Sequence, residues 1–284
     1  MAESQTPRTW FITGASTGFG RLLAEELLRR DQNVAATARD RAKVADLERQ
    51  FPGKARAFAL DVTQPTQIVQ VAPEAIAAFG HIDVLVNNAG YGVSGAIEEV
   101  SEEEFEPMFQ TNVYGLIRTT RAFLPHFRER KSGHIINISS IGGLIGGAGW
   151  GFYNTTKFAV EGFSEALAGE MKPLGVQVTV IEPGPFRTDF LGRSGKLAER
   201  EIPEYARTAG KAREYLLTQN GKQPGNPQKA IEALIAVVDS PQPPVHLILG
   251  KSALTRFRDK IANWQKEMAA WESVTLGSDF PEGQ

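Results

Sequence analysis

Trp10-Phe11-Ile12-Thr13-Gly14-Ala15-Ser16-Thr17-Gly18-Phe19-Gly20 is an apolar run that leads directly into a turn with three glycines. Residues 20–30 follow with leucines at positions 22, 23, 27 and 28, the spacing of one helical face. A short apolar run without polar alternation is typical of a strand that is buried on both faces. The stretch therefore predicts a strand, a tight turn and a helix.

Apolar runs and helical patterns alternate along the rest of the chain. Six further runs resemble strands: 34–37, 57–60, 84–86, 135–138, 178–181 and 245–249. Buried strands separated by helices form parallel sheets between two helix layers. We therefore predict an α/β fold, a doubly wound parallel sheet of about seven strands with helices on both faces.

Residues with a capacity for binding or catalysis follow these strands at their carboxyl ends. In chain order they are Gly14, Arg39, Asp61, Asn87, Ser140 and Pro183. Ligands of parallel α/β sheets bind outside the carboxyl ends of the strands. The convergence of six positions at that edge is stronger evidence for a site than any single motif.

The glycine-rich turn has the composition of a phosphate-binding loop. Glycines at 14, 18 and 20 let the backbone approach a phosphate, and the following helix N-terminus offers N–H groups to an anion. The alternative is a tight turn without a ligand. Its place between a strand and a helix favours a dinucleotide phosphate.

The end of the second strand bears on the choice between NAD and NADP. NAD-binding folds often place an acid there, but this chain has Thr37-Ala38 followed by Arg39. A guanidinium matches a 2′-phosphate in charge and geometry, so we predict NADP, with NAD the weaker alternative. Arg39 can also be a solvated loop residue near Asp40.

Two further strand ends have open interpretations. Asp61-Val62 can hydrogen-bond the adenine or cap the next helix. The sequence Asn87-Asn88-Ala89-Gly90 can line the cofactor ribose or tie neighbouring loops together.

A serine, a tyrosine and a lysine form the candidate reacting centre. Tyr153 and Lys157 share a helix face, because positions four apart lie one turn from each other. We expect the ammonium to lower the pKa of the phenol, which is ordinarily about 10. Tyr153 would then move the proton, and Ser140 would donate a hydrogen bond to a substrate oxygen.

As a set, these motifs closely resemble the short-chain dehydrogenase/reductase family over about residues 8–190. The resemblance implies one Rossmann-like domain over residues 1–284 and a catalytic tetrad of Asn112, Ser140, Tyr153 and Lys157. Asn112, in Thr111-Asn112-Val113-Tyr114-Gly115, would help to hold a water that relays protons to the lysine. It also implies cofactor contacts from Gly14, Ser16, Thr17, Gly18, Phe19, Gly20, Arg39, Asp61, Val62, Asn87, Ala89, Gly90, Tyr153, Lys157, Pro183, Gly184 and Thr188.

The sequence departs from the family pattern at two places. Residue 17 is threonine, where some NADP-using members have a basic residue, so Arg39 lacks that support. Six glycines crowd residues 142–151, and they either leave room for a bulky substrate or permit close packing.

Residues 190–225 correspond to the family's mobile substrate lid. Candidate pocket linings are Phe190, Leu191, Tyr205 and Tyr215 from the lid, with Tyr91, Leu144, Ile145 and Trp150 outside it. These side chains predict an apolar or aromatic carbonyl or secondary alcohol as the small-molecule substrate.

A helix is predicted near residues 252–271, because Leu254, Phe257, Ile261, Trp264, Met268 and Trp271 recur at spacings of three and four. We favour packing of this stripe on its own domain. The alternatives are a subunit contact and a cover over the pocket.

Composition excludes several functions. A net charge of −2 gives no electrostatic argument for nucleic acid or anionic membranes, and no apolar run reaches the length of a membrane helix. There is no cysteine, and the four histidines are scattered, so no metal site is predicted.

The acidic residues near 98–106 are expected to form a solvated helix start, with Ser101 and Glu104 at capping-box spacing. We expect a cytoplasmic homodimer or homotetramer.

The main functional prediction is an NADP(H)-dependent oxidoreductase that transfers a hydride between the nicotinamide and a carbonyl or alcohol. A regulatory protein that binds NAD(P) without turnover is the alternative, and the intact Ser140, Tyr153 and Lys157 set argues against it. A dehydratase or epimerase of the extended branch of the superfamily fits the glycine spacing poorly.

Overall fold

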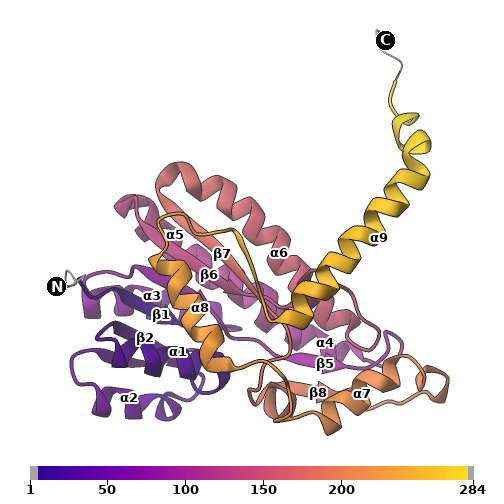
Figure 1. Ribbon diagram of the computed structural model, residues 1–284. Helices are drawn as coiled ribbons and strands as arrows, with labels where there is room; N and C mark the ends of the chain where they lie inside the picture. Colours follow the sequence, from indigo (N-terminus) through magenta and orange to yellow (C-terminus); the bar gives the residue numbers. More distant parts are fainter. Residues whose placement is uncertain (1–5, 281–284) are drawn as a thin grey trace.

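A seven-stranded, fully parallel sheet forms the centre of the protein (Figure 1), and the computed structural model describes residues 6–280. Its spatial order is β3-β2-β1-β4-β6-β7-β9. The strands are β1 (Thr9–Ile12), β2 (Asn33–Ala38), β3 (Ala55–Ala59), β4 (Val84–Asn87), β6 (Gly133–Ile138), β7 (Val176–Pro183) and β9 (His246–Leu249). The predicted doubly wound, Rossmann-like α/β fold is confirmed, and each predicted apolar run overlaps one of these strands.

The chain reverses its direction of travel across the sheet between β1 and β4. From β1 it adds β2 and β3 on one side, and then β4 and later strands on the other. Parallel register across the switch pairs Trp10 with Val34 on one side and with Val84 on the other. Such a switch point opens a crevice at the carboxyl ends of the strands, which is where this fold binds ligands.

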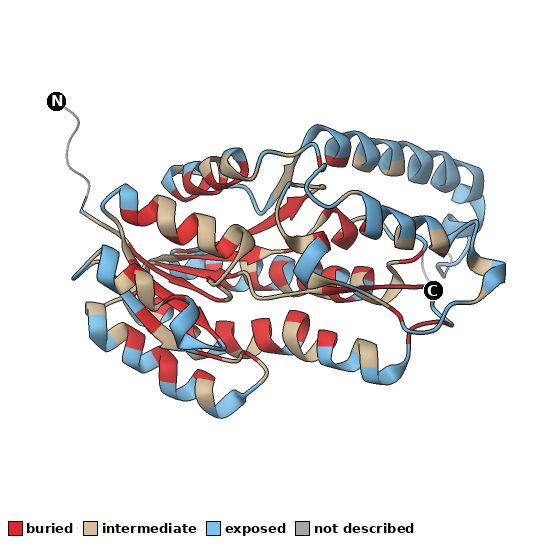
Figure 2. Ribbon diagram, turned by 90° about the horizontal axis from the view of Figure 1, so that it is seen from below, coloured by how far each residue is buried: buried red, intermediate tan, exposed pale blue. Residues whose placement is uncertain are grey.

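Two hydrophobic cores lie on opposite faces of the sheet, because successive strand side chains point to opposite faces. On one face Trp10 and Ile12 pack with α1 (Gly18–Arg29), α2 (Ala45–Gln50) and α8 (Pro227–Asp239). On the other, Phe11 packs with α3 (Pro65–Phe79), α5 (Leu116–Arg130) and α6 (Gly151–Met171). Figure 2 shows the buried sides of these helices turned toward the sheet.

A second, two-stranded parallel sheet lies outside the main one, and the sequence did not predict it. It pairs β5 (Gly92–Ser94) with β8 (Gly195–Leu197), and α7 (Ala209–Thr218) follows. Three-residue strands are too short to show a periodic pattern, so only the pairing itself reveals them.

The helix α4 (Glu102–Phe109) begins with the predicted capping box. The Glu104 carboxylate accepts from the Ser101 N–H at 2.8 Å. The expectation of a wholly solvated acidic stretch is wrong at Glu99, which is 5% exposed. Its carboxylate accepts from the N–H groups of Ala96 (2.7 Å) and Ile202 (2.8 Å) and so joins this loop to the lid.

The last helix, α9 (Lys251–Leu276), projects away from the rest of the protein (Figure 1). Ala253 is buried, but residues 261–276 are all exposed. The expectation that its apolar stripe packs on its own domain is therefore wrong for the outer residues Ile261, Trp264, Met268 and Trp271. Among residues 6–280, no helix combines the length and the apolar character that a bilayer crossing requires.

Candidate active site

The carboxyl ends of the strands surround one cavity of about 1090 Å³. It collects residues from the glycine turn, from the ends of β2, β3, β4, β6 and β7, and from α6 and the lid. Of the predicted site residues, the cavity is lined by Gly14, Ser16, Thr17, Gly18, Phe19, Arg39, Asp61, Val62, Ala89, Gly90, Ser140, Tyr153, Lys157, Pro183, Gly184 and Thr188. Residues from seven separate chain segments thus meet where the sequence analysis expected them.

Three predicted site residues lie behind the cavity wall instead: Gly20, Asn87 and Asn112. Asn87 is 3% exposed, and its amide donates to Thr120 Oγ1 and Asn137 Oδ1, both at 2.9 Å. The prediction that Asn87 contacts the cofactor is therefore wrong in this structure, where it ties β4 to its neighbours. Gly20 acts through packing, because a Cβ there would lie 2.5 Å from the Gly14 carbonyl oxygen.

The glycine turn has the geometry of an anion site. Gly14 and Gly18 have left-handed φ angles of 67° and 56°, which favour glycine. Thr17 makes no side-chain cap on α1, and the first turn of the helix has no acidic residue. The N-terminus of α1 therefore keeps N–H groups and a positive dipole end for a phosphate. These features fit a dinucleotide.

Thr13 and Asn88 hold this turn in place, and for Asn88 this is the predicted tie between neighbouring loops. The Thr13 hydroxyl accepts from the N–H groups of Asn88 (2.9 Å) and Ala89 (3.0 Å). The Asn88 amide donates to the carbonyls of Thr13 (2.9 Å) and Gly14 (3.0 Å). Their only signal in the sequence is their position at two strand ends that become neighbours in the sheet.

Arg39 lies at the end of β2, exposed and at the rim of the cavity. Its neighbour Asp40 accepts from the Ala42 N–H at 3.0 Å. Within residues 6–280 Arg39 has no ion-pair partner, so its guanidinium is available to a ligand. The position of Asp61 is compatible with both an adenine contact and a cap of the next segment. It lines the cavity, and its carboxylate accepts from the Thr63 N–H (2.9 Å) and hydroxyl (2.7 Å).

Tyr153 and Lys157 lie one turn apart on α6 and both face the cavity. The Lys157 ammonium lies 5.8 Å from the centre of the Tyr153 ring and donates to the Ile138 carbonyl at 2.8 Å. Ser140 follows β6, and its hydroxyl accepts from the Gly142 N–H at 3.0 Å. Serine, tyrosine and lysine thus come together from a strand end and a helix.

Burial dominates the protonation of this group. It raises the pKa of Tyr153 to about 12, with a smaller opposing effect from the Ser140 hydroxyl. It lowers the pKa of Lys157 to about 8, opposed by the charge of Glu161. The expectation that the phenol pKa is lowered is therefore wrong here, because desolvation is the largest influence on it. Tyr153 is protonated at neutral pH and is ready to act as an acid.

Asn112 lies in a π-helical turn (Gln110–Gly115) between α4 and α5. Its amide accepts from the Tyr91 N–H (3.0 Å) and donates to the Tyr91 carbonyl (2.8 Å) and to Thr156 Oγ1 (3.0 Å). Single-turn π-helices often mark functional sites. The turn brings Asn112 against the loop after β4 and against α6, next to Lys157, while the implied water-holding role stays a prediction.

Comparison with known proteins places this site in a family. A sequence profile described as short chain dehydrogenase matches residues 8–197. The chain belongs to the short-chain dehydrogenase/reductase family. It is accordingly an oxidoreductase that acts on CH–OH or C=O groups with a nicotinamide cofactor.

Several relatives are similar over nearly the whole chain. Oxidoreductase BOA17 of Botryotinia fuckeliana (strain B05.10) is 39% identical over 273 residues, 95% of this chain and 99% of that protein. Human retinol dehydrogenase 8 is 34% identical over 84% of this chain and 80% of its own. The structure of a short-chain dehydrogenase from Streptomyces avermitilis has a TM-score of 0.91 at 40% identity, covering 98% of this chain and 100% of that one.

Related structures contain either nicotinamide cofactor. ElxO with NADP bound has a TM-score of 0.72 at 25% identity, over 88% of this chain and 100% of that one. A 3-ketoacyl-(acyl-carrier-protein) reductase from Brucella melitensis with NADH has a TM-score of 0.70 at 28% identity, over 85% of this chain and 96% of that one.

The glycines between Ser140 and Tyr153 differ in their surroundings in this short-chain dehydrogenase. Side chains at Gly142, Gly143, Gly149 and Gly151 would collide with neighbours at 2.1–2.6 Å, so these positions permit close packing. Gly146 faces open space, and Gly147, which lines the cavity, has only one atom within 4 Å of its Cβ position.

The substrate side of the cavity has an apolar wall. Tyr91, Ile145, Trp150, Phe190, Leu191 and Tyr215 line it as predicted. Two other candidate linings are wrong. Tyr205 lies at the surface with its hydroxyl 2.9 Å from Glu98, and Leu144 does not line the cavity.

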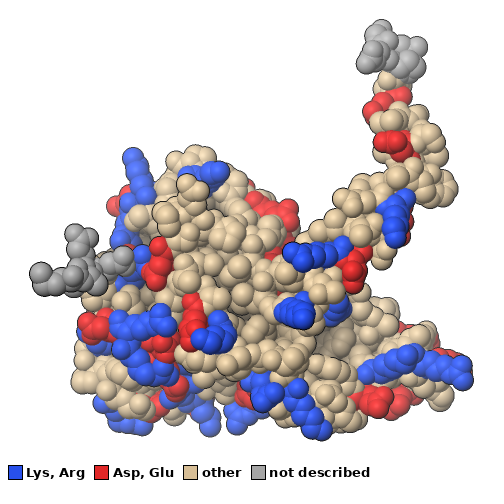
Figure 3. Space-filling view, in the orientation of Figure 1, with Lys and Arg blue, Asp and Glu red and all other residues tan. Residues whose placement is uncertain are grey.

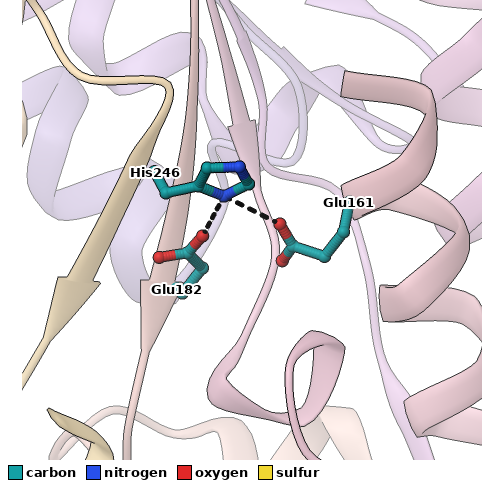
Figure 4. Close-up of side chains that lie close together, drawn as sticks. All are labelled: Glu161, Glu182 and His246. Carbon is teal, nitrogen blue, oxygen red and sulfur yellow. Dashed lines mark hydrogen bonds and ion pairs between the residues drawn. The ribbon is translucent and has the colours of Figure 1, made fainter. Parts of the chain in front are cut away.

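An unpredicted cluster of two carboxylates and a histidine lies behind Lys157, on α6, β7 and β9 (Figure 4). His246 Nδ1 is 2.7 Å from a Glu182 oxygen and 3.5 Å from a Glu161 oxygen. A metal ion between two ligands at ordinary distances of about 2 Å would hold them more than 3 Å apart. The short His246–Glu182 contact therefore indicates a hydrogen-bonded acid–base cluster.

The two carboxyls of this cluster make stability depend on pH. Burial raises the pKa of Glu161 and of Glu182 above the ordinary value of 4.5, and the mutual repulsion of Glu161 and Glu182 adds to it for Glu161. Unfolding releases their protons at pH values where the folded state retains them. The free energy of unfolding should therefore fall as pH rises from about 5 to about 8.

Glu182→Gln tests this dependence. The neutral amide removes one of the two ionisable groups, so we expect the loss of stability between about pH 5 and pH 8 to be smaller than in the unaltered chain. Denaturant unfolding at several pH values measures it. Glu170→Gln, on the exposed side of α6, is the matched control and should leave the pH dependence unchanged. Equal slopes in all three proteins would contradict the explanation.

Proposed function

We propose that this protein is an NADP(H)-dependent oxidoreductase that interconverts the carbonyl and alcohol forms of an apolar or aromatic substrate, a ketone and its secondary alcohol or an aldehyde. The observation that carries the proposal is the meeting of two sites in one cavity. The glycine turn with the N-terminus of α1 offers a phosphate site, and Ser140, Tyr153 and Lys157 offer a proton donor with its supporting groups. The arrangement suits hydride transfer coupled to proton transfer.

The bound nicotinamide would supply or accept the hydride. Tyr153 donates its hydroxyl proton to the substrate oxygen during reduction and takes it back during oxidation. Ser140 donates a hydrogen bond to the same oxygen, where negative charge develops. Lys157, with its pKa lowered to about 8, exchanges protons near neutral pH and is placed to resupply the phenol.

Arg39 supports the choice of NADP. It lies at the cavity rim where a ribose 2′-phosphate is expected, and no acid stands at the end of β2. Arg39→Gln should therefore lower kcat/KM with NADPH by about 10–100-fold, because a charge-assisted hydrogen bond contributes about 1.5–3 kcal/mol. The value with NADH should change little.

Steady-state rates with each cofactor measure this effect. Arg56→Gln is the matched control, since Arg56 is an exposed arginine on the neighbouring β3 outside the cavity. Equal losses with both cofactors, or an unaltered protein that prefers NADH, would refute the NADP assignment.

The apolar wall supports the substrate class. Aromatic and aliphatic side chains from the loop after β4, the glycine-rich loop and the lid surround the space beside Tyr153. One relative, retinol dehydrogenase 8, is named for a long apolar alcohol. In a panel followed by NADPH absorbance, we expect turnover of aromatic and long-chain ketones or aldehydes. Turnover of small charged polyols alone would refute this.

A further inference from the structure

The exposed part of α9 has the surface of a helix that packs against another helix. The helix has 26 residues, and Trp264, Met268 and Trp271 are 58%, 60% and 65% exposed. Figure 3 shows this helix as an arm that stands clear of the body. Intrinsic helix propensity alone gives an isolated helix little stability in water. We therefore expect the apolar stripe of this exposed helix to be covered by a binding partner.

The stripe on α9 is narrow and regular. Leu254, Phe257, Ile261, Trp264, Met268 and Trp271 follow spacings of three, four, three, four and three residues. This is the a/d pattern of a coiled-coil seam, whereas a helix that lies on a membrane needs a wider apolar face. The pattern favours a second helix as the partner.

The charges beside the seam select the orientation. The charged residues at the e and g positions are Lys251, Arg258 and Lys260 near the base and Glu267 and Glu272 in the outer half, and the uncharged ones are Ala253, Gln265 and Val274. In a parallel pair, Glu267 would face the partner's Glu272, and like charges would repel. In an antiparallel pair the basic base of each helix faces the acidic outer half of the other. The acidic outer half also disfavours an anionic membrane.

We propose that α9 pairs with α9 of a second copy of this chain, antiparallel and about a two-fold axis. One register satisfies the whole seam: Leu254 opposite the partner's Trp271, Phe257 opposite the partner's Met268, and Ile261 opposite the partner's Trp264. The same register brings Lys251 to the partner's Glu272. Two-fold symmetry makes each contact twice.

The body of the protein holds the arm in position for this pairing. The Lys260 ammonium donates to the Leu144 carbonyl and lies 5.1 Å from the centre of the Phe158 ring and 4.7 Å from that of Trp264. These contacts anchor the base of α9 to α6 and the loop before it. The outer turns of α9 continue along the helix axis whose direction is fixed by these contacts at its base.

The first experiment measures the assembly by sedimentation of the full chain. The unaltered protein should be a dimer at micromolar concentration, and Trp264→Ala/Trp271→Ala should raise its dissociation constant by about 30-fold or more. Both side chains are exposed in the single chain, so the fold should persist by circular dichroism. Asn263→Ala/Ser273→Ala, off the seam on the same helix, should remain dimeric. A monomeric unaltered protein, or a dimer indifferent to the tryptophans, overturns the proposal.

The second experiment tests register and direction by disulfide cross-linking. The chain has no cysteine, so introduced thiols report without background. Leu254→Cys/Trp271→Cys should give a covalent dimer on oxidation, because only facing positions come within the reach of a disulfide. Leu254→Cys alone should stay uncrosslinked. Efficient cross-linking of that single variant would show a parallel pair, and binding of the monomer to anionic phospholipid vesicles would show a membrane surface instead; either result overturns the proposal.

Discussion

Tyr153→Phe is expected to lower kcat/KM for carbonyl reduction by about 10³-fold, within the range that general acids contribute. The change removes the proton that the substrate oxygen must receive and leaves the ring in place between Trp150 and Phe190, whose ring centres lie 5.6 and 5.9 Å away. Cofactor binding should persist, because the glycine turn and Arg39 are untouched. Rate assays with NADPH measure kcat/KM, and fluorescence titration measures cofactor binding.

Tyr205→Phe is the matched control for this prediction. Its hydroxyl meets Glu98 at the surface, so its loss should change the rate less than twofold, as for a surface substitution. The pH dependence adds an independent check. With its pKa raised to about 12, the Tyr153 phenol stays protonated through neutral pH, whereas Lys157 loses its proton near pH 8, so reduction should decline above about pH 8. Activity of Tyr153→Phe within tenfold of the unaltered enzyme would refute the assigned role.

Gly20→Ala is expected to destabilise the fold by about 1–3 kcal/mol and to weaken cofactor binding, as overpacking in a tight site does. An added Cβ would lie 2.5 Å from both the Gly14 carbonyl oxygen and the Asn88 amide nitrogen. Neither can yield easily, because Asn88 holds the carbonyls of Thr13 and Gly14. The glycine turn must therefore move, and its phosphate site moves with it.

Gly162→Ala is the matched control, since its Cβ would meet nothing within 4 Å on the exposed side of α6. Alanine in a helix is preferred over glycine by about 0.5–1 kcal/mol, so this variant should be more stable than the unaltered protein. Denaturant unfolding gives both free energies, and cofactor titration gives the affinities. If Gly20→Ala has the same free energy of unfolding and the same cofactor affinity as Gly162→Ala, close packing at Gly20 does not control the stability of the turn or its phosphate site.

Strand ends were readable from the sequence because each signal is local. Gly14, Ser140 and Pro183 each follow an apolar run, and parallel strands in a doubly wound sheet bring such positions to one edge. How deeply a residue is buried at that edge depends on residues that are distant in the sequence. Asn87 and Asn88 are adjacent and chemically identical, yet Asn87 is buried among Thr120 and Asn137 while Asn88 lines the cavity. The two side chains differ because successive residues at the end of β4 point in opposite directions, and the folded sheet decides which direction leads into the cavity.

Protonation could not be inferred from spacing either. Tyr153 and Lys157 four residues apart place a cation near a phenol, which lowers its pKa, but the depth of the cavity reverses the sign. Desolvation depends on every segment that excludes water from the site, including the lid. The same reason hid Glu161, Glu182 and His246, which come from three distant segments and share one buried space.

The sequence by itself determined the α/β class, the order of the seven strands along the chain, the glycine-rich turn after β1 and the choice of serine, tyrosine and lysine as the candidate reacting centre. These follow from periodicity and from residue types within a few positions of one another. The tertiary structure alone decided which residues reach the cavity, how burial sets the pKa of Tyr153 and Lys157, and that α9 leaves the body with its apolar stripe uncovered. Those properties depend on which distant segments pack together, and a local pattern shows that a face is apolar without showing what covers it.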